Sequence, residues 1–204
     1  MIEIPNNSRL KGSSQKGQPL RKLPIILSHR LARTSDIPAI MALMDAAIVH
    51  NMAAFLSRAE IEAARDSMGI DRSLIADQTY FIVETIIDDA SVMVGCGGWG
   101  RRRTLYGGDE TSGRDDRLSN PATEAARIRA MYTHPDWIRC GVGSYLLELG
   151  ESAARQEGFS RIELGSTVPG EPLYRAAGYQ TVRRESHVSS SGAESAIIVM
   201  SKSI

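Results

Sequence analysis

The run from residue 126 to residue 156 constrains the fold more than any other part of the chain. Residues 126–133 are predicted to form a strand, and a turn follows it. Beyond the turn, apolar residues recur at helical spacing, at Val142, Tyr145, Leu146, Leu149 and Ala153. A second strand is predicted at residues 160–166. Strand–helix–strand units belong to α/β folds, so we expect an α/β fold with a mixed sheet.

The segments around this run complete the expected sheet. Upstream, a short strand is predicted at residues 30–33, followed by one helix from residue 34 onward and a second at 57–68. Two antiparallel strands are then predicted at residues 80–87 and 91–100. Downstream, a short helix is predicted at residues 171–177. A hairpin follows, with its two strands at residues 180–189 and 195–201.

Two local patterns add detail. Ser57 and Glu60 have the spacing of a helix capping box. Gly95, Gly97 and Gly98 are unusual inside a strand, and they predict a bulge or a close approach to the backbone.

The chain is expected to be one domain with an N-terminal arm. Residues 1–24 are rich in Ser, Asn, Gly, Gln and Lys and have little apolar periodicity, so we expect a disordered arm. Residues 25–204 are expected to form a single domain. Within it, residues 103–121 form a long polar loop, of a kind that is usually functional or disordered.

The composition narrows the classes of partner. Lys plus Arg and Asp plus Glu are equal at 24 each, so the net charge does not favour nucleic acid. The two cysteines, Cys96 and Cys140, indicate neither a disulfide framework nor a zinc site. No apolar run approaches the roughly 20 residues that span a bilayer, and the N-terminus lacks a secretory signal. We therefore expect a cytoplasmic protein that binds no metal, membrane or nucleic acid.

The turn before residue 142 has the features of an anion site. The first amides of a helix have no partner within the helix and carry partial positive charge. Gly141 and Gly143 let a diphosphate approach these amides, and Arg139 adds a positive charge. The same glycine pattern also occurs in plain tight turns. It is not the dinucleotide-binding fingerprint, because Leu146 occupies the place of the third glycine.

The wider stretch resembles the acyl-CoA-binding motif of the GNAT superfamily of N-acetyltransferases. The resemblance is strongest over residues 126–182, and the order of elements extends it from about residue 31 to the C-terminus. The matching segments are His134-Pro135-Asp136-Trp137, Gly141-Val142-Gly143-Ser144-Tyr145-Leu146-Leu147, Ile162-Glu163-Leu164 and Pro172-Leu173-Tyr174-Arg175-Ala176-Ala177-Gly178-Tyr179.

The resemblance implies a mostly antiparallel sheet with helices on both faces and two splayed parallel strands that form the acyl-CoA cleft. Acetyl-CoA would be the acyl donor, without a metal, and the acceptor would be a small-molecule or peptide amine. Such domains often form homodimers. Backbone groups of the cleft strand would contact the acyl donor, from Met131, Tyr132 and Thr133. The turn and the helix start would hold the diphosphate, from Arg139, Cys140, Gly141, Val142, Gly143 and Ser144.

Two side chains of the turn depart from the family pattern. Ile138 occupies a position where the family usually has Gln or Arg, and Cys140 replaces a residue that is often basic. A cradle of backbone amides does not depend on these side chains. We therefore expect the backbone to make the principal phosphate contacts.

Acetyl transfer to an amine needs an oxyanion donor, an acid near the departing thiolate and a route to deprotonate the amine. By analogy with the family, the backbone amide of Met131 or Tyr132 is the expected oxyanion donor. Tyr174 is the predicted general acid, and its alternative role is that of a buried tyrosine anchoring the short helix.

The base has several candidates. Glu84 lies in the middle of a predicted strand beside the expected acceptor cleft, where a solvated carboxylate without a catalytic role is the alternative. Glu124 and His134 are further candidates, and a chain of waters can replace a single base. For His134, a role in capping a helix is the competing interpretation.

The wall of the acceptor pocket is expected to include Trp99, Arg101 and Tyr106, with Phe55 and the first helices opposite. Successive arginines at residues 101–103 usually form a solvated surface, although here they can also recognise an acidic acceptor.

Three other functions remain open from the sequence. The fold can serve as a non-catalytic acyl-CoA sensor or regulatory module. A nucleotide-binding oxidoreductase is disfavoured by the missing third glycine and by the C-terminal hairpin. A thiol hydrolase or acyl carrier would use Cys140, because a cysteine at a helix N-terminus can be nucleophilic.

Overall fold

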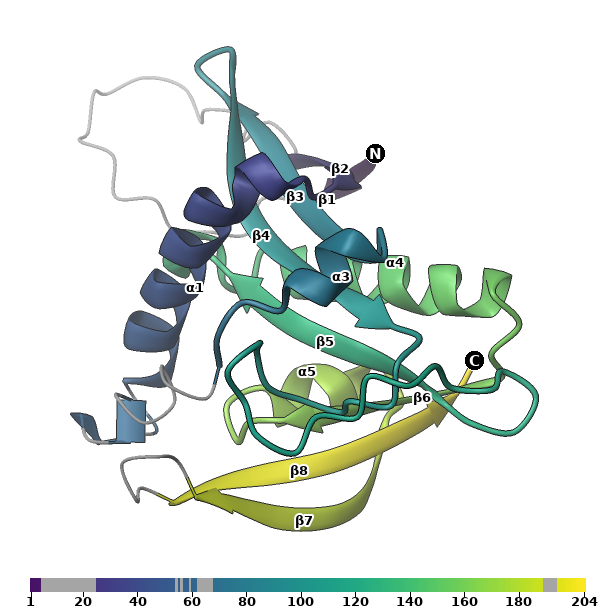
Figure 1. The fold of residues 1–204 in the computed structure, drawn as a ribbon. Helices are drawn as coiled ribbons and strands as arrows, with labels where there is room; N and C mark the ends of the chain where they lie inside the picture. The colour runs from purple at the N-terminus through teal and green to yellow at the C-terminus, as the bar shows by residue number, and fades with distance from the viewer. Residues whose placement is uncertain (5–24, 54, 56, 59, 62–67, 189–193) are drawn as a thin grey trace.

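The centre of the molecule is one eight-stranded sheet, in the order β1-β2-β3-β4-β5-β6-β8-β7 (Figure 1). This computed structural model describes residues 1–4, 25–53, 55, 57–58, 60–61, 68–188 and 194–204. The strands are β1 Ile2–Ile4, β2 Ile25–Leu31, β3 Tyr80–Ile87, β4 Ala90–Gly100, β5 Ala126–Thr133, β6 Arg161–Ser166, β7 Gln180–Val188 and β8 Glu194–Ser203. Neighbouring strands are antiparallel except for β5 and β6, which are parallel.

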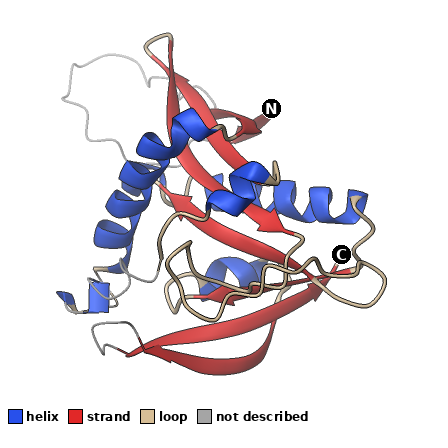
Figure 2. Cartoon of the chain, viewed as in Figure 1, coloured by secondary structure: helices blue, strands red, loops and turns tan. Residues whose placement is uncertain are grey.

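Helices cover both faces of the sheet (Figures 1 and 2). The helical segments are η1 Thr34–Asp36, α1 Ile37–Met52, α3 Arg72–Ala76, η2 Pro135–Trp137, α4 Val142–Gln156 and α5 Glu171–Ala176. α1 and α3 pack on one face, and α4 and α5 pack on the other. The expected fold class, a mostly antiparallel α/β sheet between helices, is therefore confirmed.

Two apolar cores follow from the alternation of side chains along the strands. On β3, Tyr80 and Ile82 join the core beneath α1, whereas Phe81 and Val83 join the core beneath α4. In the core beneath α4, Leu146 of that helix is fully buried. Residues from both cores meet on β4 and β5, so these central strands are held rigidly from both sides.

Most predicted elements are present within a residue or two of their expected bounds. β2 begins earlier than expected, at Ile25, because Ile25 and Leu27 are buried in the core. The short helix α3 was not predicted; Asp71 caps it by accepting a hydrogen bond from the Ser73 amide at 3.1 Å. Strand β1 was also not predicted, and Ile2–Ile4 pair with β2 where the sequence suggested an unstructured arm.

Two predictions fall largely outside the described residues. These are the remainder of the arm, at residues 5–24, and most of the helix expected at 57–68. At the start of that helix, the Ser57 amide donates to Glu60 Oε2 at 2.7 Å, and the Glu60 amide donates to Ser57 Oγ at 3.3 Å. The predicted capping box is therefore confirmed.

The long loop after β4 lies across the face of the sheet that carries α3 (Figure 1). A buried ion network anchors it. Asp71 lies 2.7 Å from Arg129 Nη2 and 3.2 Å from Arg114 Nη2, and the side chain of Asp71 is completely buried. Arg129 Nη1 also donates to the carbonyl of Thr104 at 2.8 Å. The loop is therefore an ordered layer tied to the sheet.

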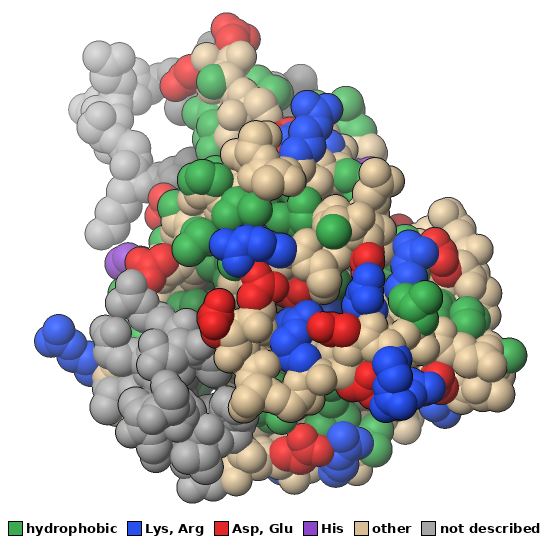
Figure 3. Space-filling model, in the orientation of Figure 1, with side chains coloured by type: hydrophobic (Ala, Val, Ile, Leu, Met, Phe, Trp, Pro, Cys, Tyr) green, Lys and Arg blue, Asp and Glu red, His purple; other side chains and the backbone are tan. Residues whose placement is uncertain are grey.

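The surface has no single dominant charge on the face that carries α1 and α3, where basic and acidic side chains are interspersed (Figure 3). Across the residues that the structure describes, no helix is long and apolar enough to cross a membrane. In the same part of the chain, no group of three or more His, Cys, Asp or Glu side chains is placed to hold a metal ion.

Candidate functional site

The two parallel strands at the centre of the sheet diverge. β5 and β6 pair only near their amino ends, where Ala126 faces Ile162 and Arg127 faces Glu163. Further along, β5 follows β4 as far as Thr133, while β6 follows β8 as far as Ser166. The carboxyl halves of β5 and β6 therefore have no shared ladder, which is the splayed arrangement expected for an acyl-CoA cleft.

A bulge interrupts β5 at this opening. Cys96 pairs with Tyr132 and Gly98 pairs with Arg129, so two residues of β5, Ala130 and Met131, lie opposite Gly97. Ala130 has a φ of +51°, a left-handed conformation that is strained for a residue with a side chain.

The glycines of β4 allow this geometry. A Cβ atom on Gly97 would lie 3.0 Å from the Met131 Cα and 3.2 Å from the Ala130 carbonyl oxygen. At Gly95, a Cβ atom would overlap the side chain of Val142, so α4 sits directly on the strand. The prediction of a bulge or a close backbone approach at these glycines is confirmed.

The ladder determines which amides of β5 are free. The amide of His134 donates to the carbonyl of Val94 at 2.9 Å, so these residues form a hydrogen-bonded pair. Hydrogen-bonded and non-bonded pairs alternate along an antiparallel ladder. Tyr132 therefore directs its amide toward Cys96 on β4, whereas the amide of Met131 points away from β4. Of the two expected oxyanion donors, only Met131 has an amide available to the cleft.

Thr133 ends the cleft strand, and its backbone also points away from β4. Its carbonyl accepts a hydrogen bond from Asn51 Nδ2 of α1 at 2.9 Å. A Cβ atom on Gly143 would lie 3.9 Å from Thr133 Oγ1 and 3.0 Å from Leu173 Cδ2. The end of β5, the start of α4 and the start of α5 therefore meet at one place.

The turn between β5 and α4 adopts unusual backbone angles. Arg139 has a φ of +63° and Gly141 a φ of +79°, and Cys140 lies between them. The left-handed angle at Gly141 suits a residue without a Cβ atom. The Arg139 side chain is exposed and makes no ion pair with any described residue. Its guanidinium is therefore available to an anion.

The helix that follows presents three open amides. The Tyr145 amide makes the first bond of the helix, to the Gly141 carbonyl at 3.0 Å. The amides of Val142, Gly143 and Ser144 precede that bond, so no helical carbonyl accepts from them. The helix dipole adds partial positive charge at the same point. These residues form a cradle that fits a diphosphate.

Cys140 does not have the surroundings of a nucleophile. Its thiol is buried and lies 3.6 Å from the carbonyl oxygen of Ile138. No described histidine forms a hydrogen bond with it. A catalytic cysteine needs a base nearby, so the geometry does not favour the thiol-based alternative.

Tyr174 lies on α5, beside the open end of the cleft. Burial raises the pKa of the Tyr174 hydroxyl to about 12, so the phenol stays protonated near neutral pH. Its ring packs edge-on against Tyr179 with 5.9 Å between ring centroids. The hydroxyl forms no hydrogen bond with the part of the chain that the structure describes. The ring anchors the helix, and the hydroxyl keeps a proton to donate.

The candidate bases are engaged elsewhere. Glu84 accepts a hydrogen bond from Arg30 Nε at 3.1 Å and lies on β3, with β4 between it and the cleft strand. Glu124 is paired with Arg103 at 2.8 Å, and the hydrogen bond from Arg103 lowers the pKa of its carboxyl. His134 Nδ1 accepts from the Asp136 amide at 3.3 Å, as a residue that caps a helix does.

The expected acceptor wall is only partly brought together. Trp99 is buried in the core beneath α4, and the Arg101 guanidinium lies 5.5 Å from its ring centroid. The arginines at 101–103 are each paired within the chain, with Glu157, Asp77 and Glu124 respectively. Each guanidinium therefore already has a partner carboxylate within the chain. Phe55 is 60% exposed, so its ring is accessible from solvent.

Tyr106 is the residue of this set that lies at the cleft. A Cβ atom on Gly165 of β6 would be 3.1 Å from Tyr106 Cδ1, so the tyrosine packs on the carboxyl half of β6. Burial raises the pKa of the Tyr106 hydroxyl. The long loop therefore borders the cleft through Tyr106.

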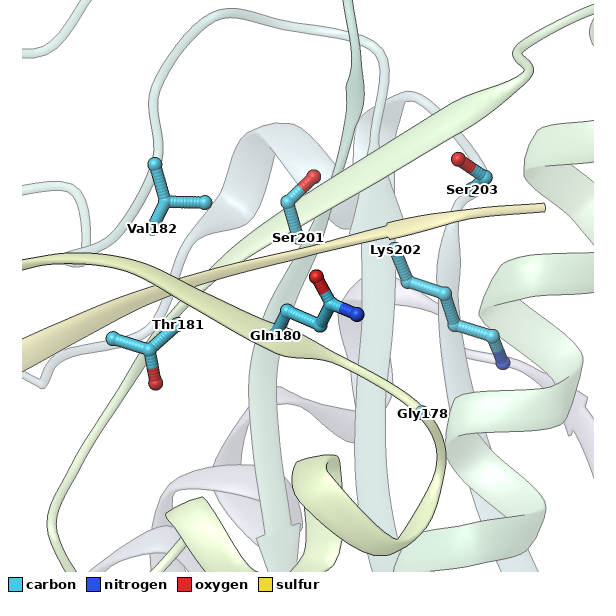
Figure 4. A pocket seen from close by; sticks show the side chains of 7 residues that line it. All are labelled: Gly178, Gln180, Thr181, Val182, Ser201, Lys202 and Ser203. Carbon is cyan, nitrogen blue, oxygen red and sulfur yellow. The ribbon is translucent and has the colours of Figure 1, made fainter.

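A separate pocket of about 490 Å³ lies at the start of β7 and the end of β8 (Figure 4). Its lining residues are Gly178, Gln180, Thr181, Val182, Ser201, Lys202 and Ser203. Ser203 pairs with Arg161, at the amino end of β6. The pocket is thus at the end of β6 opposite the splayed opening.

Solved structures with the same fold include several acetyltransferases. A GCN5-related N-acetyltransferase from Rhodopseudomonas palustris has 20% identity and a TM-score of 0.62, covering 87% of this chain and 95% of that chain. The PaiA N-acetyltransferase from Thermoplasma acidophilum, solved with coenzyme A, has 12% identity and a TM-score of 0.56, covering 88% and 99%. A ribosomal-protein-alanine N-acetyltransferase from Brucella melitensis has 17% identity and a TM-score of 0.55, covering 87% and 99%.

At these identities the likeness to solved structures establishes the fold alone. The comparison with curated proteins found no match. The family model of the GNAT acetyltransferase domain matches residues 76–181, just over half of the chain, and includes both splayed strands, α4 and α5. The chain therefore belongs to the GNAT acetyltransferase family.

Proposed function

We propose that this protein transfers an acetyl group from acetyl-CoA to a primary amine by direct attack in a ternary complex. The observation that carries the proposal is the splayed end of β5 and β6, which lies beside three open amides at the start of α4. An acyl-CoA needs both features, since its pantetheine arm is extended and its diphosphate is anionic.

The diphosphate is held mainly by backbone groups. The amides of Val142, Gly143 and Ser144 donate to it, and the left-handed turn at Gly141 keeps the approach clear of side chains. Arg139 contributes a charge-assisted contact from its exposed guanidinium. Cys140 contributes backbone only, because its thiol is turned into the protein.

The acetyl group lies against the bulge of β5. The amide of Met131 donates to the acetyl oxygen as negative charge develops there, and Thr133 aligns the pantetheine arm through its backbone. Tyr174, which its raised pKa keeps protonated, donates toward the departing thiolate. For the base, we favour water over Glu84, because Arg30 already binds that carboxylate.

The test is a turnover screen with acetyl-CoA over polyamines, amino acids, aminoglycosides and peptides, read by the release of free CoA. Tyr174→Phe is the companion variant. It should lower kcat by about a hundredfold or more, as expected when a general acid is lost, with little change in the affinity for CoA. Undiminished turnover in this variant would remove Tyr174 from the mechanism. Binding of acetyl-CoA without turnover on the whole panel would favour the non-catalytic sensor instead.

A further inference from the structure

Tyr80 makes a contact that links three strands. It lies on β3 and is only 1% exposed, and its hydroxyl donates to the carbonyl oxygen of Ala130 on β5 at 3.1 Å. Because β4 lies between β3 and β5, the side chain crosses a whole strand to reach this oxygen. The acceptor is the one carbonyl that belongs to the strained residue of the bulge.

The planarity of the peptide bond gives this contact a consequence. The carbonyl of Ala130 and the amide of Met131 belong to the same peptide unit, and in a trans peptide they point in opposite directions. A hydroxyl that holds the carbonyl toward β3 therefore holds the Met131 amide away from β3 and β4. That direction leads to the opening between β5 and β6.

The conformation at Ala130 needs such a restraint. A residue with a side chain adopts a left-handed φ only where its surroundings enforce it. On the opposite strand, Gly97 has no side chain, so it leaves room for the bulge without fixing its orientation. The Tyr80 hydroxyl supplies the directional contact that the glycine lacks.

Cys96 completes the set of hydrogen bonds. The Tyr80 hydroxyl also lies within donating distance of Cys96 Sγ, at 3.4 Å. The hydroxyl has a single proton, and the Ala130 carbonyl at 3.1 Å is a stronger acceptor than sulfur, so the proton is directed to Ala130. Burial raises the pKa of Tyr80 well above its ordinary value and raises the pKa of Cys96 to about 12. Both groups keep their protons across the physiological range, so the donor to Ala130 is always present.

We infer that Tyr80 is a positioning residue for acetyl transfer, which aims the Met131 amide at the acetyl oxygen by holding the Ala130 carbonyl. The inference rests on the proposed function. It assigns to Tyr80 a role that its place in the core, far along the chain from the acyl-CoA motif, does not suggest.

The test compares two ligands on the full-length Tyr80→Phe variant. One is CoA, and the other is the unreactive ketone analogue of acetyl-CoA in which a methylene group replaces the thioester sulfur. The analogue presents a carbonyl to Met131, and CoA does not. We expect the affinity for CoA to stay within about twofold, while the affinity for the analogue falls about fivefold, as for one lost hydrogen bond. In turnover, kcat should fall at least about tenfold, and KM should change less.

Thr85→Val is the matched control. Thr85 also lies on β3 and is buried, and its hydroxyl donates to the Ile26 carbonyl at 2.9 Å, away from the bulge. In this variant, the ratio of the affinity for the analogue to the affinity for CoA should stay as in the wild type, and so should kcat. A partly unfolded sample lowers both affinities alike and leaves their ratio intact, so reduced stability does not obscure the result. Gly97→Ala, which presses on the same peptide, should lower the ratio as Tyr80→Phe does.

An unchanged ratio in Tyr80→Phe would overturn the inference, and so would a fall of the same size in Thr85→Val. Failure of the proposed function would give a different experimental result. In that case, the wild-type protein would release no CoA and would not distinguish the analogue from CoA.

Discussion

Removing the charge of Asp71 should destabilise the protein strongly. In Asp71→Asn the side chain keeps its shape, but Arg129 and Arg114 lose their shared counter-charge. Arg114 still has Asp116 at 3.1 Å on the exposed side of the loop. Arg129 is only 3% exposed, and among the described residues it keeps the neutral carbonyls of Thr104 and Gly107 as partners. The cost is therefore mainly that of one buried, unpaired guanidinium.

Breaking a buried ion pair in this way costs about 3–5 kcal/mol of unfolding free energy. At about 2–4 °C per kcal/mol for a domain of this size, the midpoint of thermal unfolding should fall by roughly 6–20 °C. Urea unfolding measures the same change, and Trp99 is a suitable fluorescent reporter because it is 2% exposed. Asp115→Asn is the control, since its partner Arg117 has a side chain that is 75% exposed, and it should unfold like the wild type.

Asp71→Asn also tests how the stability of the fold depends on pH. Burial acts to raise the pKa of Asp71, but the hydrogen bond from Ser73 and the charges of Arg129 and Arg114 outweigh it, so the pKa is lowered. A lowered carboxyl pKa stabilises the fold above the ordinary aspartate range, and this contribution is lost as the pH falls through the folded-state pKa. The difference in unfolding free energy between the wild type and Asp71→Asn should be constant from pH 8 to about 5 and shrink below about pH 4. A difference under about 1 kcal/mol at pH 7 would refute the reasoning.

Other variants probe the cleft. Gly143→Val should weaken CoA binding at least about tenfold, because a Cβ atom there would already lie 3.0 Å from Leu173 Cδ2 and the larger side chain would crowd the start of α4; calorimetric titration measures this. Gly95→Val should lower stability and CoA affinity together, because its side chain would displace Val142 and with it the start of α4; unfolding and titration on one sample check this coupling. Raising the salt concentration should weaken CoA binding more in the wild type than in Arg139→Ala, whose exposed charge has been removed.

Strong periodicity made much of the fold predictable. β3 and β5 have the predicted bounds, and α4 begins one residue after the predicted glycine. The open amides at the start of α4 were also predictable, because a glycine turn before a helix has a local physical meaning. α3 was missed because its five residues are too few to show a helical period.

The contacts that orient the site leave no local pattern. Asn51 reaches Thr133 across 82 positions of sequence, and Tyr80 reaches Ala130 across 50. Ala130 itself gives no signal of a left-handed φ, since such a conformation is usually marked by glycine or asparagine. The ion pairs of the arginines at 101–103 could not be predicted for the same reason, because their partners lie elsewhere in the chain.

The splayed opening and the open amides beside it have a common origin in the path of the chain. A helix that links two parallel strands starts at the carboxyl end of the first strand, so α4 presents its open amides at the end of β5. The same end is open because β6 pairs with β5 at only two positions. The opposite edge of β6 pairs with β8 at six positions, as far as Ser166, so the strand stays part of the sheet where it leaves β5. The C-terminal hairpin, although distant from the acyl-CoA motif in sequence, therefore supports the strand that borders the opening.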